Sequence, residues 1–281
     1  MKLGFLVLAA GCAGDPPTDG GTDGPPTCNG ASCDRPFDAL ALAIAHNAMN
    51  VEDEGWALPN QHVGYEQQVA DGIRGFMLDV YDVDGVPTLC HAACSLGSEP
   101  LATALDRFAA LLDANPGDVF VFVIQDELDY PLVVDAFDQS ALAGRLIGEV
   151  DGWPTVGALV EADTRLLVTH EQPRPGAPAW YHPAYELAWD NDYAAASVED
   201  FDCAVLRGDA SNDVFLLNHF LTNGVASPEL ADEANPYDVI LDHADRCEAE
   251  AGDLVNWIAV DFYDQGDVFG VVDALNARRD P

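Results

Sequence analysis

The sequence predicts a single α/β domain built as a barrel of parallel strands. Three observations support this fold class. Short apolar runs alternate with helical patterns, as in repeated βα units. Polar residues follow the apolar part of most of these runs. The chain has 281 residues, 49% of them hydrophobic, and a closed α/β barrel commonly uses this length as one domain. Residues 28–281 are globular in composition without a second linker, so we expect them to form the domain.

The expected elements follow in chain order. The apolar runs predict strands at residues 39–45, 75–80, 88–90, 119–124, 165–169, 214–217 and 257–260. An eighth strand is expected within residues 185–206. Between the strands, residues 100–114 predict a helix with Leu101, Leu105, Phe108 and Leu112 on one face. Pro100 suits the first turn of that helix.

The N-terminal residues form a targeting segment. Lys2 precedes a short apolar run that ends at Leu8-Ala9-Ala10-Gly11-Cys12, and this run is too short to span a membrane. It resembles a bacterial lipobox, so we expect residues 1–11 to be a lipoprotein signal peptide and Cys12 to be lipidated. The alternative is an ordinary cleaved signal that leaves Cys12 as a free thiol. Residues 12–27 then form the lipidated cysteine and a flexible Gly/Pro/Asp tether. The expected location is the bacterial cell envelope, after export.

The charge of the chain excludes several classes of function. There are 49 acidic residues against 11 basic ones, which gives a formal charge of −38, and Lys2 is the only lysine. The mature chain therefore cannot use Schiff-base or P-loop lysine chemistry. Nucleic-acid binding is disfavoured because phosphate contacts need a basic patch. An anionic membrane face would repel the chain, so we interpret the charge as a solvated acidic surface.

Seven cysteines support export to an oxidising compartment. With Cys12 assigned to lipid, six remain. Their spacing suggests the pairs 28–33, 90–94 and 203–247, although six cysteines allow fifteen pairings. A zinc site is the competing interpretation, and it is disfavoured because the chain contains no CxxC pair.

Polar residues cluster at the ends of the predicted strands. In a barrel of parallel strands, these carboxyl ends converge on one face, where active sites lie. The residues at such positions are His46-Asn47, Asp79, His91, Gln125-Asp126, His170, Asn218-His219 and Asp261.

Several of these residues lie in ordered motifs. The motifs are Cys28-Asn29-Gly30 with Cys33-Asp34-Arg35-Pro36, Ala45-His46-Asn47-Ala48-Met49, residues 72–82, Leu89-Cys90-His91, Asn115-Pro116 and residues 258–263. In this order and spacing they resemble the phosphatidylinositol phospholipase C X-domain superfamily, and most closely its secreted plant and microbial PLC-like phosphodiesterases. The resemblance covers nearly the whole chain after Cys28. It implies an irregular TIM (β/α)8 barrel and a monomeric enzyme that cleaves phosphatidylinositol-type lipids through a cyclic inositol phosphate.

The expected reaction requires two proton-transfer groups. A base takes the proton of the attacking sugar hydroxyl, and an acid protonates the leaving alkoxide; histidine can do both near neutral pH. The resemblance implies that His46 is the base and His91 the acid. A base histidine works best when a carboxylate orients it, and Asp261 is the candidate.

The phosphoryl oxygens need a positive charge. The resembling enzymes use either an arginine or a calcium ion. Asn47, Asp79 and Asp126 are the expected ligands of Ca²⁺, and Arg74 is the alternative cation if the enzyme needs no metal. His170, His219 and Tyr263 are expected to line the substrate pocket. Because the chain is poor in Arg and Lys, an unphosphorylated inositol or another neutral head group is favoured.

Two other functions are weighed against this one. The first is a glycerophosphodiester phosphodiesterase on the same barrel, which residues 78–91 resemble. That family expects Arg-Gly after its first histidine and a Glu before its aspartate, where this chain has Asn47-Ala48 and Met77. The second is a non-catalytic surface lipoprotein that binds lipids or glycans, and the intact pair of histidines argues against it.

Overall fold

The structure is a computed structural model that describes residue 28 and residues 32–279. The expected signal peptide, lipidated Cys12 and tether lie outside the described residues. The described part is built on one curled sheet whose parallel strands are joined by helices, so the predicted α/β barrel class is confirmed.

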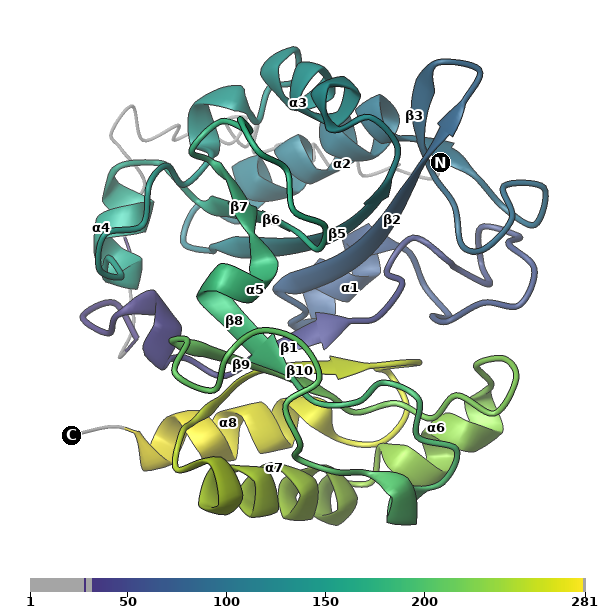
Figure 1. Ribbon diagram of the computed structural model, residues 1–281, viewed down its shortest axis with the longest axis vertical. Coiled ribbons are helices and arrows are strands. Elements are labelled where there is room, and N and C mark those ends of the chain that lie inside the picture. The colour runs from purple at the N-terminus through teal and green to yellow at the C-terminus, as the bar shows by residue number, and fades with distance from the viewer. Residues whose placement is uncertain (1–27, 29–31, 280–281) are drawn as a thin grey trace, which may run out of the picture.

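Eight parallel strands form the curled sheet (Figure 1). Their order is β7-β6-β5-β2-β1-β10-β9-β8, and all seven neighbouring pairs are parallel. The strands are β1 (Leu42–Ala45), β2 (Gly75–Val83), β5 (Phe120–Glu127), β6 (Leu166–His170), β7 (Tyr181–Pro183), β8 (Ala188–Asp190), β9 (Val214–Asn218) and β10 (Val255–Val260).

The barrel is irregular because its two end strands, β7 and β8, are not paired with each other among the described residues. The short helix α5 (Ala184–Leu187) connects them directly. Strand β8 is the one expected within residues 185–206, whereas β7 was not predicted. The predicted strand at 88–90 corresponds to β3 (Val86–Leu89), which is antiparallel to β2 and to β4 (Glu99–Pro100). It belongs to a hairpin extension rather than to the barrel.

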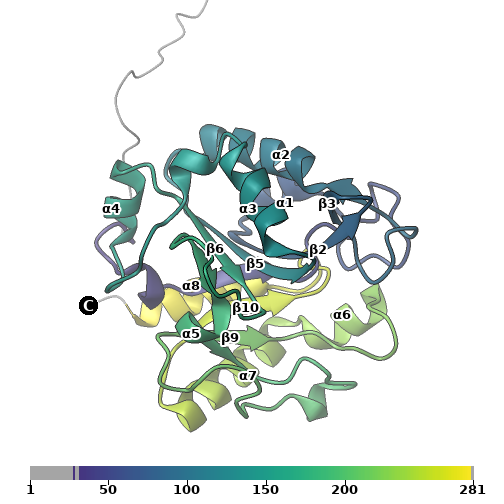
Figure 2. The same ribbon diagram turned by 45° about the horizontal axis from the view of Figure 1, so that its top comes forward.

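Helices cover the outside of the sheet. Helices α2 and α3 lie along one flank and α7 and α8 along the opposite flank (Figures 1 and 2). The predicted helix is confirmed as α2, and its four apolar face residues are fully buried. The α-helices, besides α5, are α1 (Tyr65–Asp71), α2 (Leu101–Ala114), α3 (Tyr130–Asp138), α4 (Val156–Glu161), α6 (Pro228–Ala234), α7 (Tyr237–Ala251) and α8 (Val268–Arg278); short 3-10 turns occur at Phe37–Ala39, Ala143–Arg145 and Val198–Asp200.

Alternate residues of each strand enter two different apolar layers. On β2, Met77 packs inside the barrel, while Phe76 and Leu78 pack against the helices. The interior is narrow at its amino end, since a Cβ on Gly75 would overlap Cδ1 of Ile44. Strands buried on both faces are nearly continuous in hydrophobicity. The sequence pattern therefore locates the strands but does not reveal which residues face inward.

Disulfides join Cys28 to Cys33, Cys90 to Cys94 and Cys203 to Cys247. The pairing suggested by the spacing is confirmed. Every helix in the described part of the chain is too short or too polar to cross a bilayer.

Candidate active site

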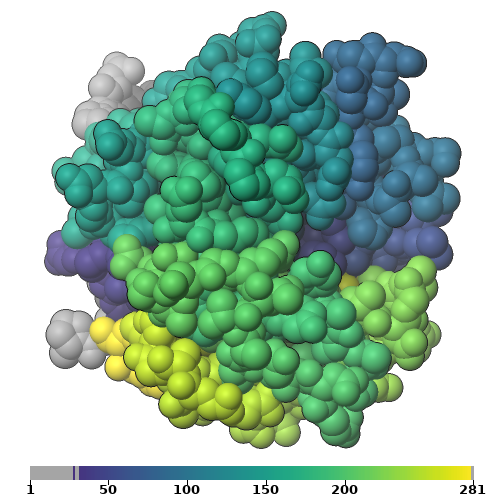
Figure 3. Space-filling view, in the orientation of Figure 1, coloured from purple at the N-terminus to yellow at the C-terminus, as the bar shows by residue number. Residues whose placement is uncertain are grey.

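A cavity of about 640 Å³ opens at the carboxyl ends of the barrel strands. The segment that follows β1, purple in Figure 3, is visible between the blue-teal and green parts of the surface. His46, Asp79, His91 and Asp261 all line this cavity. The structure therefore brings both expected catalytic histidines and a carboxylate partner for each to one site.

His46 lies directly after β1 and is held from both ring nitrogens. Its Nδ1 lies 2.8 Å from Oδ1 of Asp261, which follows β10. Asn60 donates a second hydrogen bond of 2.8 Å to the same oxygen, and Phe220 stacks on the imidazole at 3.8 Å between ring centroids. Because the carboxylate only accepts, Nδ1 carries the hydrogen. The other nitrogen, Nε2, then accepts from Nδ2 of Asn47 at 3.0 Å. His46 is thus held in the tautomer that a general base requires.

His91 forms a second histidine–carboxylate pair. Its Nδ1 lies 3.1 Å from Oδ2 of Asp79, which lies in the middle of β2 and lines the cavity. The hydrogen bond that His91 donates to Asp79 is the main reason that the pKa of His91 is raised above its usual value; burial opposes this rise. The Cys90–Cys94 disulfide closes the short loop that carries His91, and the backbone N–H of Cys90 donates to the carbonyl of Asp79. A raised pKa keeps more of the imidazole protonated, as a general acid requires.

Arg207 lines the same cavity, although it belongs to none of the motifs in the sequence. Its guanidinium binds Asp190 through Nη2 at 2.5 Å and Nε at 3.0 Å, and binds Glu171 through Nη1 at 3.0 Å. It also lies 4.5 Å from the ring centre of Tyr185 and 5.0 Å from that of Tyr193. It is the one Arg or Lys among the described residues that line the cavity. The one clue to Arg207 in the sequence was that arginines are rare in so acidic a chain.

Arg207 compensates the negative charges of its two acidic neighbours, Asp190 and Glu171, to different extents. Asp190 is completely buried and also accepts hydrogen bonds from Asn218 and Tyr185. Glu171 lines the cavity, and burial raises its pKa despite the nearby guanidinium. This side of the cavity therefore offers carboxylate acceptors, guanidinium donors and the tyrosine ring of Tyr193, groups that can form hydrogen bonds with hydroxyl groups.

Three expected substrate-binding residues do not line the cavity. His170 is buried and its Nδ1 faces the carbonyl of Gln172. His219 is buried against α7. Tyr263 is buried and donates from its hydroxyl to Asp71 at 2.8 Å. His170 precedes Glu171, and His219 lies between Asn218 and Phe220. Because these neighbours line the cavity, the two imidazoles point away from it. These expected roles are corrected accordingly.

Asp126 and Arg74 are also placed away from the cavity. Asp126 faces outward from β5, where Arg174 at 2.8 Å and Tyr181 at 3.0 Å bind its Oδ2. Its neighbours Gln125 and Glu127 line the cavity instead. Arg74 precedes β2 at the amino end of the barrel and forms an ion pair of 2.7 Å with Asp118. Arg74 therefore braces the barrel and does not reach a substrate phosphate.

The residues present do not form a ready calcium site. Asn47 and Asp79 line the cavity as expected, but Asp79 is bound to His91 and Asp126 is absent from the cavity. Calcium takes six to eight oxygen ligands. In the described chain, no three His, Cys, Asp or Glu side chains of the cavity bring ligand atoms within 4.8 Å of one another. The one such group comprises Cys203, His243 and Cys247, and its sulfurs are joined in a disulfide.

The chain matches the family model described as PI-PLC X 1 over residues 32–276. The chain belongs to the PI-PLC X domain family. A PI-PLC X domain-containing protein of Arabidopsis thaliana is 24% identical over 86% of this chain, and an uncharacterized secreted protein of Arthroderma benhamiae is 25% identical over 89%. The chain spans 62% and 63% of the lengths of these two relatives.

Solved structures of family enzymes share the fold. The phosphatidylinositol-specific phospholipase C of Staphylococcus aureus superposes with a TM-score of 0.59 over 85% of this chain and 93% of its own, at 13% identity. The enzyme of Listeria monocytogenes gives a TM-score of 0.56 over 90% of this chain and 95% of its own, at 17% identity. At these identities the comparison establishes the barrel and leaves the chemistry to the residues of this chain.

Proposed function

We propose that this PI-PLC X domain protein is a phosphodiesterase that cleaves inositol-type phospholipids by internal attack. The observation that carries the proposal is the presence of two histidine–carboxylate pairs, His46 with Asp261 and His91 with Asp79, at one cavity. One pair presents an unprotonated Nε2, and the other has its protonated form favoured. A displacement at phosphorus needs both.

The residues divide the reaction between them. Nε2 of His46 takes the proton from a head-group hydroxyl, and the hydroxyl oxygen then bonds to phosphorus. The bond from phosphorus to the glycerol oxygen breaks as His91 gives that oxygen a proton. The products are a cyclic phosphate of the head group and a neutral diacylglycerol-type alcohol. The His91 imidazolium provides positive charge near the phosphoryl oxygens, and the remaining N–H groups of Arg207 donate to head-group hydroxyls.

The rim of the cavity favours a lipid substrate over a soluble one. Leu58, Tyr193 and Val225 line the cavity, yet 46–52% of each residue is exposed. The stretches of residues 55–65, 193–198 and 219–228 around them contain no Asp or Glu, although the whole chain has 49 acidic residues and the exposed Glu127 also lines the cavity. These uncharged stretches of the rim can approach the surface of a lipid aggregate, while acyl chains stay outside the cavity.

We also propose that the protein is exported and anchored through a lipid on Cys12. The support is the lipobox-like sequence before Cys12 and the three disulfides, which are typical of oxidising compartments. An anchor would keep the barrel near its substrate surface.

Phosphorus NMR of a panel of phosphodiesters tests the proposed activity. The panel contains phosphatidylinositol, phosphatidylcholine, a glycosylated inositol lipid and soluble glycerophosphodiesters. We expect a cyclic phosphate from an inositol lipid. Cleavage of only the soluble glycerophosphodiesters would instead identify the glycerophosphodiesterase alternative, and binding without cleavage would identify a lipid-binding lipoprotein.

A matched control separates catalysis from folding. His46→Gln should abolish cleavage. His62 also pairs with a carboxylate, Asp264, at 2.9 Å, but it does not line the cavity. His62→Gln should therefore leave the rate nearly unchanged.

A further inference from the structure

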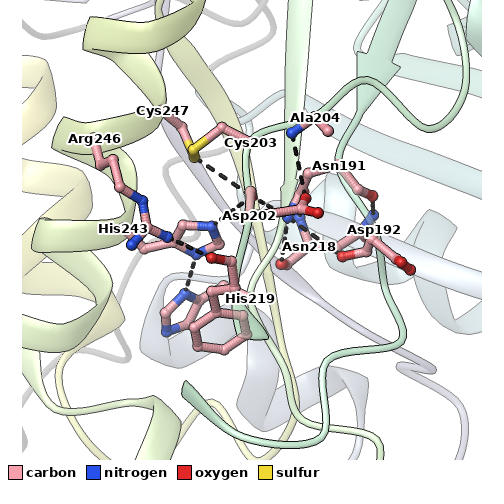
Figure 4. The surroundings of a disulfide bond; sticks show 11 residues. Asn191, Asp192, Asp202, Cys203, Ala204, Asn218, His219, His243, Arg246 and Cys247 are labelled. Atoms are coloured by element: carbon pink, nitrogen blue, oxygen red, sulfur yellow. Dashed lines mark hydrogen bonds between the residues drawn. A yellow bond between two sulfur atoms is a disulfide. The ribbon is translucent and has the colours of Figure 1, made fainter. Parts of the chain in front are cut away.

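Two buried histidines outside the cavity face each other. His219 follows β9 and His243 lies on α7, and their Nδ1 atoms are 2.8 Å apart (Figure 4). Each remaining nitrogen faces a backbone carbonyl. Nε2 of His219 lies 2.7 Å from the oxygen of Ala234, and Nε2 of His243 lies 3.0 Å from the oxygen of Asp202. The proposed reaction uses neither residue.

The number of hydrogens decides what this arrangement requires. A carbonyl oxygen only accepts, so both Nε2 atoms must carry a hydrogen to form these bonds. A neutral imidazole carries one hydrogen, and two neutral rings therefore have none left for the Nδ1 atoms. At 2.8 Å, these two Nδ1 atoms would then point unshared electron pairs at each other. A third hydrogen between the rings satisfies all three contacts.

We infer that His219 and His243 share one proton in the folded protein, as a hydrogen-bonded imidazole–imidazolium pair. The gap between the Nδ1 atoms is too short for a metal ion, because Zn–N bonds are about 2.0 Å each. A proton is the ligand that fits.

Some groups around the two histidines favour a protonated pair, and others oppose it. The ring of Phe201 stacks on both imidazoles, with centroid distances of 4.4 and 4.7 Å, and an aromatic face favours a cation. The charge of Asp202 also favours a protonated His243. The nearby Arg246 opposes it.

Burial also opposes protonation of either ring alone. Burial, followed by the charge of a protonated His243 and that of Arg246, lowers the pKa of His219 to about 3. Burial and then Arg246 lower the pKa of His243 to about 4. The N–H···N bond between the rings forms only after a proton enters, and both carbonyl bonds strengthen when the rings are charged. We therefore expect the first proton of the pair to be held with a raised pKa and the second to be excluded.

The pair fixes residues that reach the active site. His219 lies between Asn218, which donates to Asp190, and Phe220, which stacks on His46. On the other side, the Cys203–Cys247 disulfide joins the segment after Asp202 to α7. His219 and His243 are thus positioning residues for the cavity, and their shared proton holds the end of β9 against α6 and α7.

Nitrogen-15 NMR of histidine-labelled protein tests the inference without any substrate. At pH 7 we expect three hydrogens over the four ring nitrogens of the pair, with one proton bridging the Nδ1 atoms. Two hydrogens, as in two neutral rings, would overturn the inference. The result is independent of the proposed activity.

The pH dependence of stability gives a second test, because a shared proton and a neutral pair predict pH dependences of opposite sign. A group whose pKa is raised in the folded state stabilises the protein below its unfolded value, about 6.5 for histidine, and this contribution is lost as pH rises through the folded pKa. In His243→Asn, the amide can donate to Nδ1 of His219 without a shared proton. The stability difference between wild type and this variant should therefore shrink as pH rises from 6 to 9. A difference that shrinks instead as pH falls below 6 would show that the pair is neutral.

His182 provides a matched control. It is also buried, its Nε2 lies 3.1 Å from the carbonyl oxygen of Ile147, and burial lowers its pKa. The stability contribution of His182 should be lost as pH falls, so His182→Gln should change the pH dependence in the opposite direction to His243→Asn.

Discussion

Removing either catalytic histidine should abolish most turnover while the barrel stays folded. General acid and general base groups each contribute about 10²–10⁴ in rate, which corresponds to about 3–5 kcal/mol in the activation free energy. Because His46 and His91 serve opposite ends of one displacement, their losses should not add. The double variant should be little slower than the slower single variant.

The structure limits the stability lost by these variants. His46→Ala removes the stacking on Phe220, worth about 0.5–1.5 kcal/mol, while Asp261 keeps its hydrogen bond from Asn60. The side chain of His91 is 39% exposed, so the loss of its surface ion pair costs about 0–1 kcal/mol. Domains of this kind have about 5–15 kcal/mol of stability. Both variants should therefore melt cooperatively, which thermal unfolding checks.

Substrates with different leaving groups separate the two roles. An aryl phosphodiester of inositol expels a stable phenolate and needs little help from an acid. It should partly rescue His91→Ala and should not rescue His46→Ala. The reverse pattern would exchange the two roles. Near-normal rates of both variants on natural lipids would refute the two-histidine mechanism.

Further predictions concern the supporting groups. Asp79→Asn removes the main cause of the raised pKa of His91, so the basic limb of the pH–rate profile should move to lower pH; an unmoved limb would show that another group is the acid. Excess EDTA should leave most of the activity, because the cavity does not gather a calcium ligand set, and a loss that calcium restores would contradict this. Arg207→Lys should raise KM more than it lowers kcat, since a lysine cannot reproduce the fork of guanidinium contacts; unchanged steady-state kinetics would remove Arg207 from the site. Mass spectrometry of the mature N-terminus should find a diacylated Cys12, and an unmodified Cys12 would contradict the proposed anchor.

The sequence pattern predicted the positions of the strands that carry the site better than it predicted which of their side chains face the cavity. His46, Asp79 and Asp261 lie in the cavity, as expected from their positions at strand ends. Asp126 and His170 occupy similar positions but point outward. Both faces of these strands are apolar, and a one-residue shift along a strand moves a side chain to the other face. Nothing in the local pattern distinguished the inward from the outward residue.

Other features depend on contacts that are distant in the chain. Arg207 lies 17 residues after Asp190, in a segment without regular secondary structure, and also contacts Glu171 after β6. Strand β7 has only three residues and carries a proline, so it lacks a strand signal. The hairpin strand β3 looked like a barrel strand because its last two residues, Thr88 and Leu89, are suited to a strand and are buried.

The lack of pairing between β7 and β8 in the described chain has a consequence for local unfolding. A fully closed barrel has no weakest seam, whereas in the described chain the two end strands, β7 and β8, are not paired with each other, and each has three residues. The margin of β8 carries one isolated bridge, from Asp190 to Arg207. Local opening should start there, so the amides of β7 and β8 should exchange with deuterium before those of β1 and β2 at the centre of the sheet. The margins are also too short to recruit the backbone of another chain, which protects the molecule from edge-to-edge aggregation. Arg207 spans the seam by binding Asp190 of β8 and Glu171 next to β6, so occupancy of the cavity near Arg207 should slow this exchange.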